Sequence, residues 1–257
     1  MRRRVGLSFF FLLCLIVFLA LNMPLVQILS RVNLPEKLSI SGLNGSILKG
    51  SAEQVLLDRI ALNNFRYQLD SRCLLSFRVC YQTQFEQGKG ELQAGLFDQS
   101  LTMINFDMTY SLVNLSAYAD KLLVQPTGLL HLTIDSLSVK NQQINQINAS
   151  ALWQSAGVSG ELVNLGDYEL ILSSGNQLYQ FQLKDRKALL TVDGKGQIKA
   201  NGQYSANISI RSAPGLNQSI KSALEFVAKK QGLNQYSIRR TGQLPTQMMS
   251  LLSFSDT

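Results

Sequence analysis

The stretch Ile104-Asn105-Phe106-Asp107-Met108-Thr109-Tyr110-Ser111-Leu112 alternates apolar and polar residues without a break. Successive side chains of a β-strand point to opposite faces of a sheet, so this period of two predicts a strand with one apolar face. The same alternation recurs at 65–70, 130–134, 147–153, 168–172, 179–183 and 204–210. We therefore predict an all-β protein, mainly antiparallel, built as an extended curved or sandwich-like sheet.

Glycine-rich segments between these stretches predict hairpin turns, because glycine adopts the positive φ angles that tight turns need. They are Gly88-Lys89-Gly90, Ser174-Gly175-Asn176 and Asp193-Gly194-Lys195-Gly196. The first and last also resemble each other in the residues that follow them. This similarity indicates two duplicated halves, 31–125 and 128–257, with the shared composition of hairpin turns as the alternative explanation.

One segment near the C-terminus has helical spacing instead. After Pro214-Gly215, apolar residues fall at Leu216, Ile220, Ala223, Leu224 and Val227. This spacing predicts one amphipathic helix, with Lys229-Lys230 in its last turn and Gly232 as its C-cap.

The N-terminus combines a basic tip with an apolar run. Arg2, Arg3 and Arg4 precede the uninterrupted apolar segment Val5 to Leu21. This length is at the lower limit for a transmembrane helix, about 17–25 residues. Basic flanks stay cytoplasmic, so we predict a cytoplasmic tip and single-pass inner-membrane anchor over residues 1–30. Residues 31–257 then form a periplasmic β-domain of a Gram-negative cell.

A cleaved signal peptide is the alternative to this anchor. Signal peptides end in small residues spaced as Ala-x-Ala, whereas the run here ends Leu19-Ala20-Leu21-Asn22-Met23. We therefore expect the segment to stay uncleaved.

The composition argues against disorder caused by charge and against nucleic-acid binding. Of the 257 residues, 46% are hydrophobic and 16% are charged, and the net charge is +7. The N-terminal arginines supply three of these charges, and the other basic residues are scattered along strands. A nucleic-acid site would need a concentrated basic stripe.

Three cysteines divide between two environments. Cys14 lies in the apolar run, whereas Cys73 and Cys80 lie in the exported part, where disulfides persist. We predict that Cys73 and Cys80 pair and close a short turn between strands; two reduced, half-buried thiols are the alternative.

The residues that could carry catalysis are few. His131 is the only histidine, and alternation with Leu130 and Leu132 directs it to the polar face of its strand. The chain has no Gly-x-Ser-x-Gly, His-Glu-x-x-His or phosphate-loop motif. We expect no enzyme activity, and no catalytic, cofactor or metal site.

Two glycine and aromatic patterns resemble the type II secretion system protein N family. Residues 40–52, Ile-Ser-Gly-Leu-Asn-Gly-Ser-Ile-Leu-Lys-Gly-Ser-Ala, are similar to its opening pattern v-x-G-x-x-G-s-l-W-x-G-x-A. Leu62 to Leu69, followed by Leu74-Leu75, resembles the next family stretch. Leu48 and Tyr67 stand where the family has tryptophan, and both keep the bulk of a core residue.

The resemblance extends over nearly the whole chain. Its later landmarks are Ala151-Leu152-Trp153-Gln154-Ser155-Ala156, Leu165-Gly166-Asp167-Tyr168, Gly202-x-Tyr204, the helix after Pro214, and Gly242-Gln243-Leu244. The resemblance implies a non-catalytic secretion subunit whose partners are the inner-membrane platform and the outer-membrane secretin. No catalytic residue is carried over.

Two functions fit these observations. The first is an assembly subunit that contacts other envelope components of a type II secretion system. The alternative is a periplasmic lipid-binding or lipid-transfer module, because one-sided apolar strands with one covering helix could line an acyl-chain groove. Neither function requires a cofactor.

Overall fold

The computed structural model describes residues 11, 23–29, 38–57, 60–115, 126–141, 143–158, 164–175, 178–199, 201–213, 216 and 218–244. The basic tip and the apolar run from Val5 to Leu21, apart from Phe11, lie outside these residues. Within the described ranges, no helix is long and apolar enough to cross a membrane. A short helix, α2 (Leu25–Leu29), follows Pro24, which forms an isolated β-bridge with Ser46.

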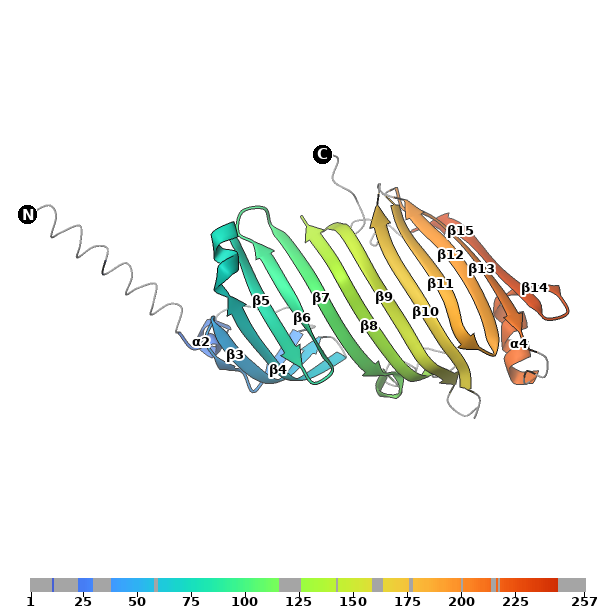
Figure 1. Ribbon diagram of the computed structural model, residues 1–257, viewed down its shortest axis with the longest axis horizontal. Helices are drawn as coiled ribbons and strands as arrows, with labels where there is room; N and C mark the ends of the chain where they lie inside the picture. The colour runs from blue at the N-terminus through green and yellow to red at the C-terminus, as the bar shows by residue number, and fades with distance from the viewer. Residues whose placement is uncertain are drawn as a thin grey trace, which may run out of the picture. The chain divides into compact units, whose positions relative to one another are not determined.

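The described strands pair antiparallel, which confirms the predicted mainly antiparallel all-β class (Figure 1). The chain divides into two compact units between Glu91 and Leu92, inside strand β6. This boundary differs from the division expected near residues 125–128, and the duplication stays a prediction.

The N-terminal unit, up to Glu91, is a meander of strands with one 3₁₀ helix, η1 (Ser71–Ser76), between β4 and β5. Its strands are β1 (Leu38–Ser41), β2 (Asn44–Gly45), β3 (Lys49–Leu57), β4 (Ile60–Asp70), β5 (Arg78–Phe85) and the start of β6 (Gly88–Gly95). Aromatic rings pack on one face: Phe65 stacks on Phe85 with centroids 6.4 Å apart, and Tyr67 meets Tyr81 edge-on at 5.9 Å. Ala52, beside Phe65 in the register, is 2% exposed.

The C-terminal unit, from Leu92, continues with strands that follow chain order except that β15 lies between β13 and β14. They are β7 (Ser100–Ser111), β8 (Pro126–Lys140), β9 (Gln143–Val158), β10 (Asn164–Gly175), β11 (Leu178–Ala188), β12 (Leu190–Lys199), β13 (Gln203–Ser212), β14 (Lys229–Gly232) and β15 (Gln235–Gln243). A 3₁₀ helix, η2 (Leu112–Leu115), follows β7.

The amphipathic helix is present as α4 (Gln218–Val227) and packs on the last strands of the sheet. Leu224 and Ala228 are buried against Val192, Ile210 and Tyr236. The predicted C-terminal end was wrong: Lys229-Lys230 begins β14 rather than ending the helix, and Gly232 ends that strand. Val227, expected on the buried face, is 52% exposed. The helix ends early because the chain must turn back into a strand that pairs with β15.

The predicted turn at Asp193-Gly194-Lys195-Gly196 was also wrong, because these residues lie inside β12. The two glycines allow neighbouring side chains to approach the strand. A Cβ atom on Gly194 would lie 3.0 Å from Ile208 Cγ1, and one on Gly196 would overlap the Phe181 ring. Glycine inside a strand often marks such a close approach.

The alternation in β7 holds from Phe106 to Tyr110 but changes at Asn105. Asn105 has φ +50°, and the pairing of β8 with β9 skips a residue at Asp135. The register between β7 and β8 is unshifted, so Ile104 pairs with Ser136 and Met103 pairs with Leu137. A β-bulge of this kind reverses the faces of the residues on its far side, so Met103 continues the apolar face of Phe106 that Ile104 was expected to extend.

Candidate functional site

One face of the C-terminal sheet carries an apolar row that crosses strands β7 to β13 and β15. Each member is the register partner of the next, and register partners share a face. The apolar row consists of Met108, Leu132, Ala151, Leu170, Leu183, Gly194, Ile208 and Ile238.

The opposite face carries a polar row formed by the residues adjacent to these along each strand. It consists of Asp107, Thr133, Ser150, Ile171, Gln182, Lys195, Asn207 and Arg239. Ile171 is its one apolar member. From β7 to β13 and β15, the sheet therefore has one apolar face and one polar face. Adjacent residues of each strand belong to the two different faces.

Helix α4 covers part of the apolar face. The buried cluster around it includes Leu183, Ile208 and Ile238 from the apolar row, but not Leu132, Ala151 or Leu170. Leu170 keeps 39% of its surface exposed. Over β10, the apolar row is thus open enough to contact a ligand or partner.

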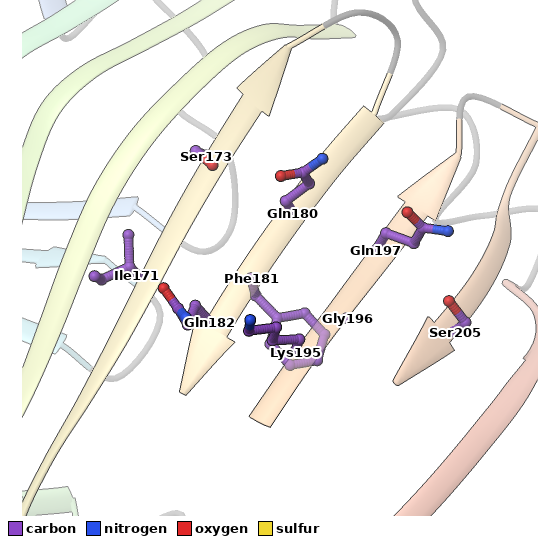
Figure 2. A pocket seen from close by; sticks show the side chains of 9 residues that line it. All are labelled: Ile171, Ser173, Gln180, Phe181, Gln182, Lys195, Gly196, Gln197 and Ser205. Carbon is purple, nitrogen blue, oxygen red and sulfur yellow. The ribbon is translucent and has the colours of Figure 1, made fainter. Parts of the chain in front are cut away.

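The polar face is hollowed over β10 to β13 in a shallow depression of about 480 Å³ (Figure 2). Amide, hydroxyl and ammonium groups line it, and Figure 2 shows that they come from neighbouring strands. The lining residues are Ile171, Ser173, Gln180, Phe181, Gln182, Lys195, Gly196, Gln197 and Ser205. Such groups can hydrogen-bond a polar or anionic ligand, but the lining contains no Asp, Glu, His or Cys that could act as a base or thiol nucleophile.

His131 has a structural environment rather than a catalytic one. Its Nε2 donates to Gln154 Oε1 at 2.8 Å, because that carbonyl oxygen can only accept. Its Nδ1 then accepts from the Thr109 hydroxyl at 2.8 Å. Both ring nitrogens are thus held by neutral groups from neighbouring strands, on the polar face that the alternation predicts. In the part of the chain that the structure describes, no three His, Cys, Asp or Glu side chains gather as a metal site.

Cys73 and Cys80 are joined as a disulfide between η1 and β5, with their Cα atoms 5.8 Å apart. Cys80 is buried, at 4% exposure. The bridge spans the turn at Phe77, which has φ +54° and ends η1. Arg2, Arg3 and Arg4, which we expect to orient the membrane segment, lie outside the described residues.

These features define an antiparallel, amphipathic β protein whose candidate sites are binding surfaces. The family model for type II secretion system protein N matches residues 36–239. The chain therefore belongs to the type II secretion system protein N family and is a component of a type II secretion system.

Two relatives of known family support this assignment. The type II secretion system protein N of Aeromonas hydrophila is 22% identical over 254 residues, which cover 95% of this chain and all of the relative. The protein of the same name from Vibrio cholerae serotype O1 is 21% identical over 256 residues, with the same coverage. No solved structure matches the chain.

The residues that carry the first family pattern build the β1–β3 corner. Gly42 and Gly45 adopt φ +62° and +108°, which favour glycine. Gly50 lies under the Tyr67 ring, whose hydroxyl donates to the Ser46 carbonyl at 2.7 Å. Burial and the nearby Tyr81 raise the pKa of the Tyr67 phenol. The first family pattern therefore specifies the turn between β1 and β3 and the glycine on which the Tyr67 ring packs.

The second-half landmarks join β9 to β10. Trp153 and Tyr168 are register partners, with ring centroids 6.2 Å apart. Asp167 Oδ1 accepts from the backbone of Ser155, which has φ +50°. Gly166 has φ +110°, and a side chain there would collide with Ala188. These residues fix a bulged register rather than forming a reactive site.

The two rows and the depression were not predicted from the sequence. Alternation predicts the two faces of each strand, but the register that aligns one strand with the next comes from the pairing. Gly194 and Gly196 of β12 were the feature of the sequence that could have indicated this part of the sheet. The same glycines equally suit a hairpin turn.

Proposed function

We propose that this chain is an inner-membrane-anchored, periplasmic subunit that assists assembly of a type II secretion system without catalysing a reaction. The observation that carries the proposal is the family match over residues 36–239. The apolar run from Val5 to Leu21 behind three arginines supports the anchor. The Cys73–Cys80 disulfide fits an oxidising compartment such as the periplasm.

In this role the sheet contacts other envelope components. The proposed partners are the inner-membrane platform and the outer-membrane secretin. An antiparallel sheet can bind such partners through either of its two faces or through an open edge strand. The C-terminal unit has both faces and such an edge.

Protease accessibility tests the proposed placement. Protease added to spheroplasts should degrade the β-domain. A tag placed ahead of Arg2 should stay intact, because the inner membrane keeps the protease away from the cytoplasmic side. A β-domain that resists protease until the inner membrane is lysed, while a known periplasmic domain is cut, contradicts periplasmic placement. A chain recovered without its apolar segment contradicts the anchor.

The apolar row supports a second candidate, binding of acyl chains. Leu132, Ala151 and Leu170 lie on the apolar face but outside the cluster around α4. A partly exposed apolar strip of this kind suits a lipid chain as well as a protein surface.

A photoactivatable fatty acid fed to cells separates these two uses of the apolar face. Lipid binding predicts crosslinks that map to β10 and that Leu170→Ser weakens. Ile171→Ser is the matched control, because both residues are 39% exposed and they lie on opposite faces. Equal crosslinking in the wild type and both variants removes the lipid candidate.

A further inference from the structure

The outer edge of β15 is only partly paired. Strand β14 covers β15 from Gln235 to Ser237 and then ends. Among the described strands, none pairs with the outer side of β15 from Ile238 to Gly242. Residues 239–243 are exposed, so this segment of backbone is accessible.

The pairing with β13 shows which backbone groups face this open edge. Leu244 N–H donates to the Gly202 carbonyl at 2.9 Å, and Ser212 N–H donates to the Asn234 carbonyl at 3.0 Å. The register between the two strands contains no shift. In an antiparallel pair, alternate residues bond to the same neighbour, so even-numbered residues of β15 face β13. Arg239 and Thr241 therefore direct their N–H and C=O groups outward.

The strands at this edge are uniformly basic. Strands β13, β14 and β15 contain no Asp or Glu. Their charged residues are Arg211, Lys229, Lys230, Arg239 and Arg240. Lys230 pairs with Glu225 of α4 at 2.8 Å, whereas Arg239 and Arg240 form no ion pair with the described residues.

We propose that the β15 edge, defined as the outer side of residues 238–242, binds an extended acidic segment of a partner protein by strand addition. This inference rests on the proposed assembly role and names its contact. Strand addition supplies partners for the outward N–H and C=O groups of Arg239 and Thr241. Arg239 and Arg240 project to opposite faces, so successive carboxylates on the added strand would meet both.

A second copy of this chain is a poorer occupant. Two β15 edges paired antiparallel would bring arginines near arginines, and like charges on facing strands are destabilising. Charge complementarity therefore selects an acidic partner over self-association.

The test compares edge variants of the full chain in crosslinked membranes, with recovery of platform and secretin subunits as the readout. Thr241→Pro removes an outward N–H donor but no bond to β13, and proline is tolerated at sheet edges. Thr241→Ala keeps the donor and is the matched control. The double variant Arg239→Glu/Arg240→Glu reverses the charge. We expect the proline and double variants to lower recovery by about tenfold, the effect of losing one strong contact, with Thr241→Ala unchanged.

Several outcomes overturn the inference. Normal recovery by both Thr241→Pro and the charge-reversed variant removes the edge contact but leaves the proposed function intact. Absence of any secretion subunit with the wild type contradicts the proposed function itself. Recovery of a differently tagged copy that Thr241→Pro abolishes assigns the edge to self-association. Severalfold higher recovery after truncation behind Leu244 assigns it to the chain's own C-terminal segment. A matching melting temperature for the Pro and Ala variants excludes misfolding as the cause of lost recovery.

Discussion

Tyr67 lies directly over Gly50 and fills the space that a side chain there would need. A Cβ atom on Gly50 would lie 2.6 Å from the Tyr67 Cζ atom and in collision with the Asn44 carbonyl oxygen. The two residues are also register partners on β3 and β4. This contact explains why a glycine at position 50 and a large aromatic residue at position 67 suit each other in this fold.

Gly50→Ala should destabilise the N-terminal unit by about 1–3 kcal/mol, the usual cost of inserting a methyl group into a packed site. Gly175→Ala is the matched control, because a Cβ atom there meets nothing within 4 Å. Chemical denaturation of both variants measures the difference. Equal stability of the two would show that Tyr67 does not pack on Gly50.

Leu224→Ala should lower the free energy of unfolding of the C-terminal unit by about 2–4 kcal/mol, because it leaves a cavity beneath α4. Leu224 is 8% exposed within the cluster that contains Val192, Ile210 and Tyr236. Phe226→Ala, at an 81% exposed position of the same helix, should change stability little. A larger effect at Phe226 than at Leu224 would reverse the assignment of the buried helix face.

Oxidation of Cys73 and Cys80 should stabilise the fold by about 2–3 kcal/mol, because it closes a short loop in the unfolded chain. The two residues are separated by seven positions. Reductant should lower the melting temperature of the wild type but leave Cys73→Ser/Cys80→Ser unaffected. Thiol labelling without reductant should modify neither cysteine in protein taken from cells; labelling of both would contradict the disulfide.

Tyr168 should make the fold sensitive to alkaline pH. Burial, with a further contribution from Asp185, raises the pKa of its phenol from 10.0 to about 12. The folded state then holds this proton more tightly than the unfolded state, so its contribution to stability is complete below pH 10 and is lost as the pH rises toward 12.

Tyr168→Phe should reduce the decrease in the free energy of unfolding between pH 10 and 12. Removal of the hydroxyl also breaks its 3.2 Å hydrogen bond to the Leu165 carbonyl. Denaturation at a series of pH values, with tyrosinate absorbance as a second readout, measures both effects. An identical alkaline slope in wild type and variant would show that Tyr168 does not carry it. Tyr67, Tyr81 and Tyr179 also have raised pKa values through burial, so some slope should persist.

The sequence predicted well what depends on neighbours along the chain. Alternation located the apolar side of Phe106, Met108 and Tyr110, and helical spacing located Leu224 on the buried side of α4. These features follow from the geometry of a single strand or helix.

What depended on contacts between strands was not predicted. Gly194 and Gly196 suit a turn and a crowded strand equally, and the position of the Phe181 ring decides between them. The bulge at Asn105 moved Ile104 off the apolar face because β8 and β9 skip a residue at Asp135. The open edge of β15 likewise depends on where β14 begins, at Lys229 opposite Ser237.

The most direct test of the assembly role is affinity purification of the mildly crosslinked, C-terminally tagged chain from membranes, with proteins and lipids identified together. We expect recovery of inner-membrane platform or secretin subunits, and loss of that recovery on Thr241→Pro but not on Thr241→Ala. Phospholipid or lipopolysaccharide bound in fixed ratio, without any secretion subunit, would contradict the assembly role and make the chain a lipid carrier.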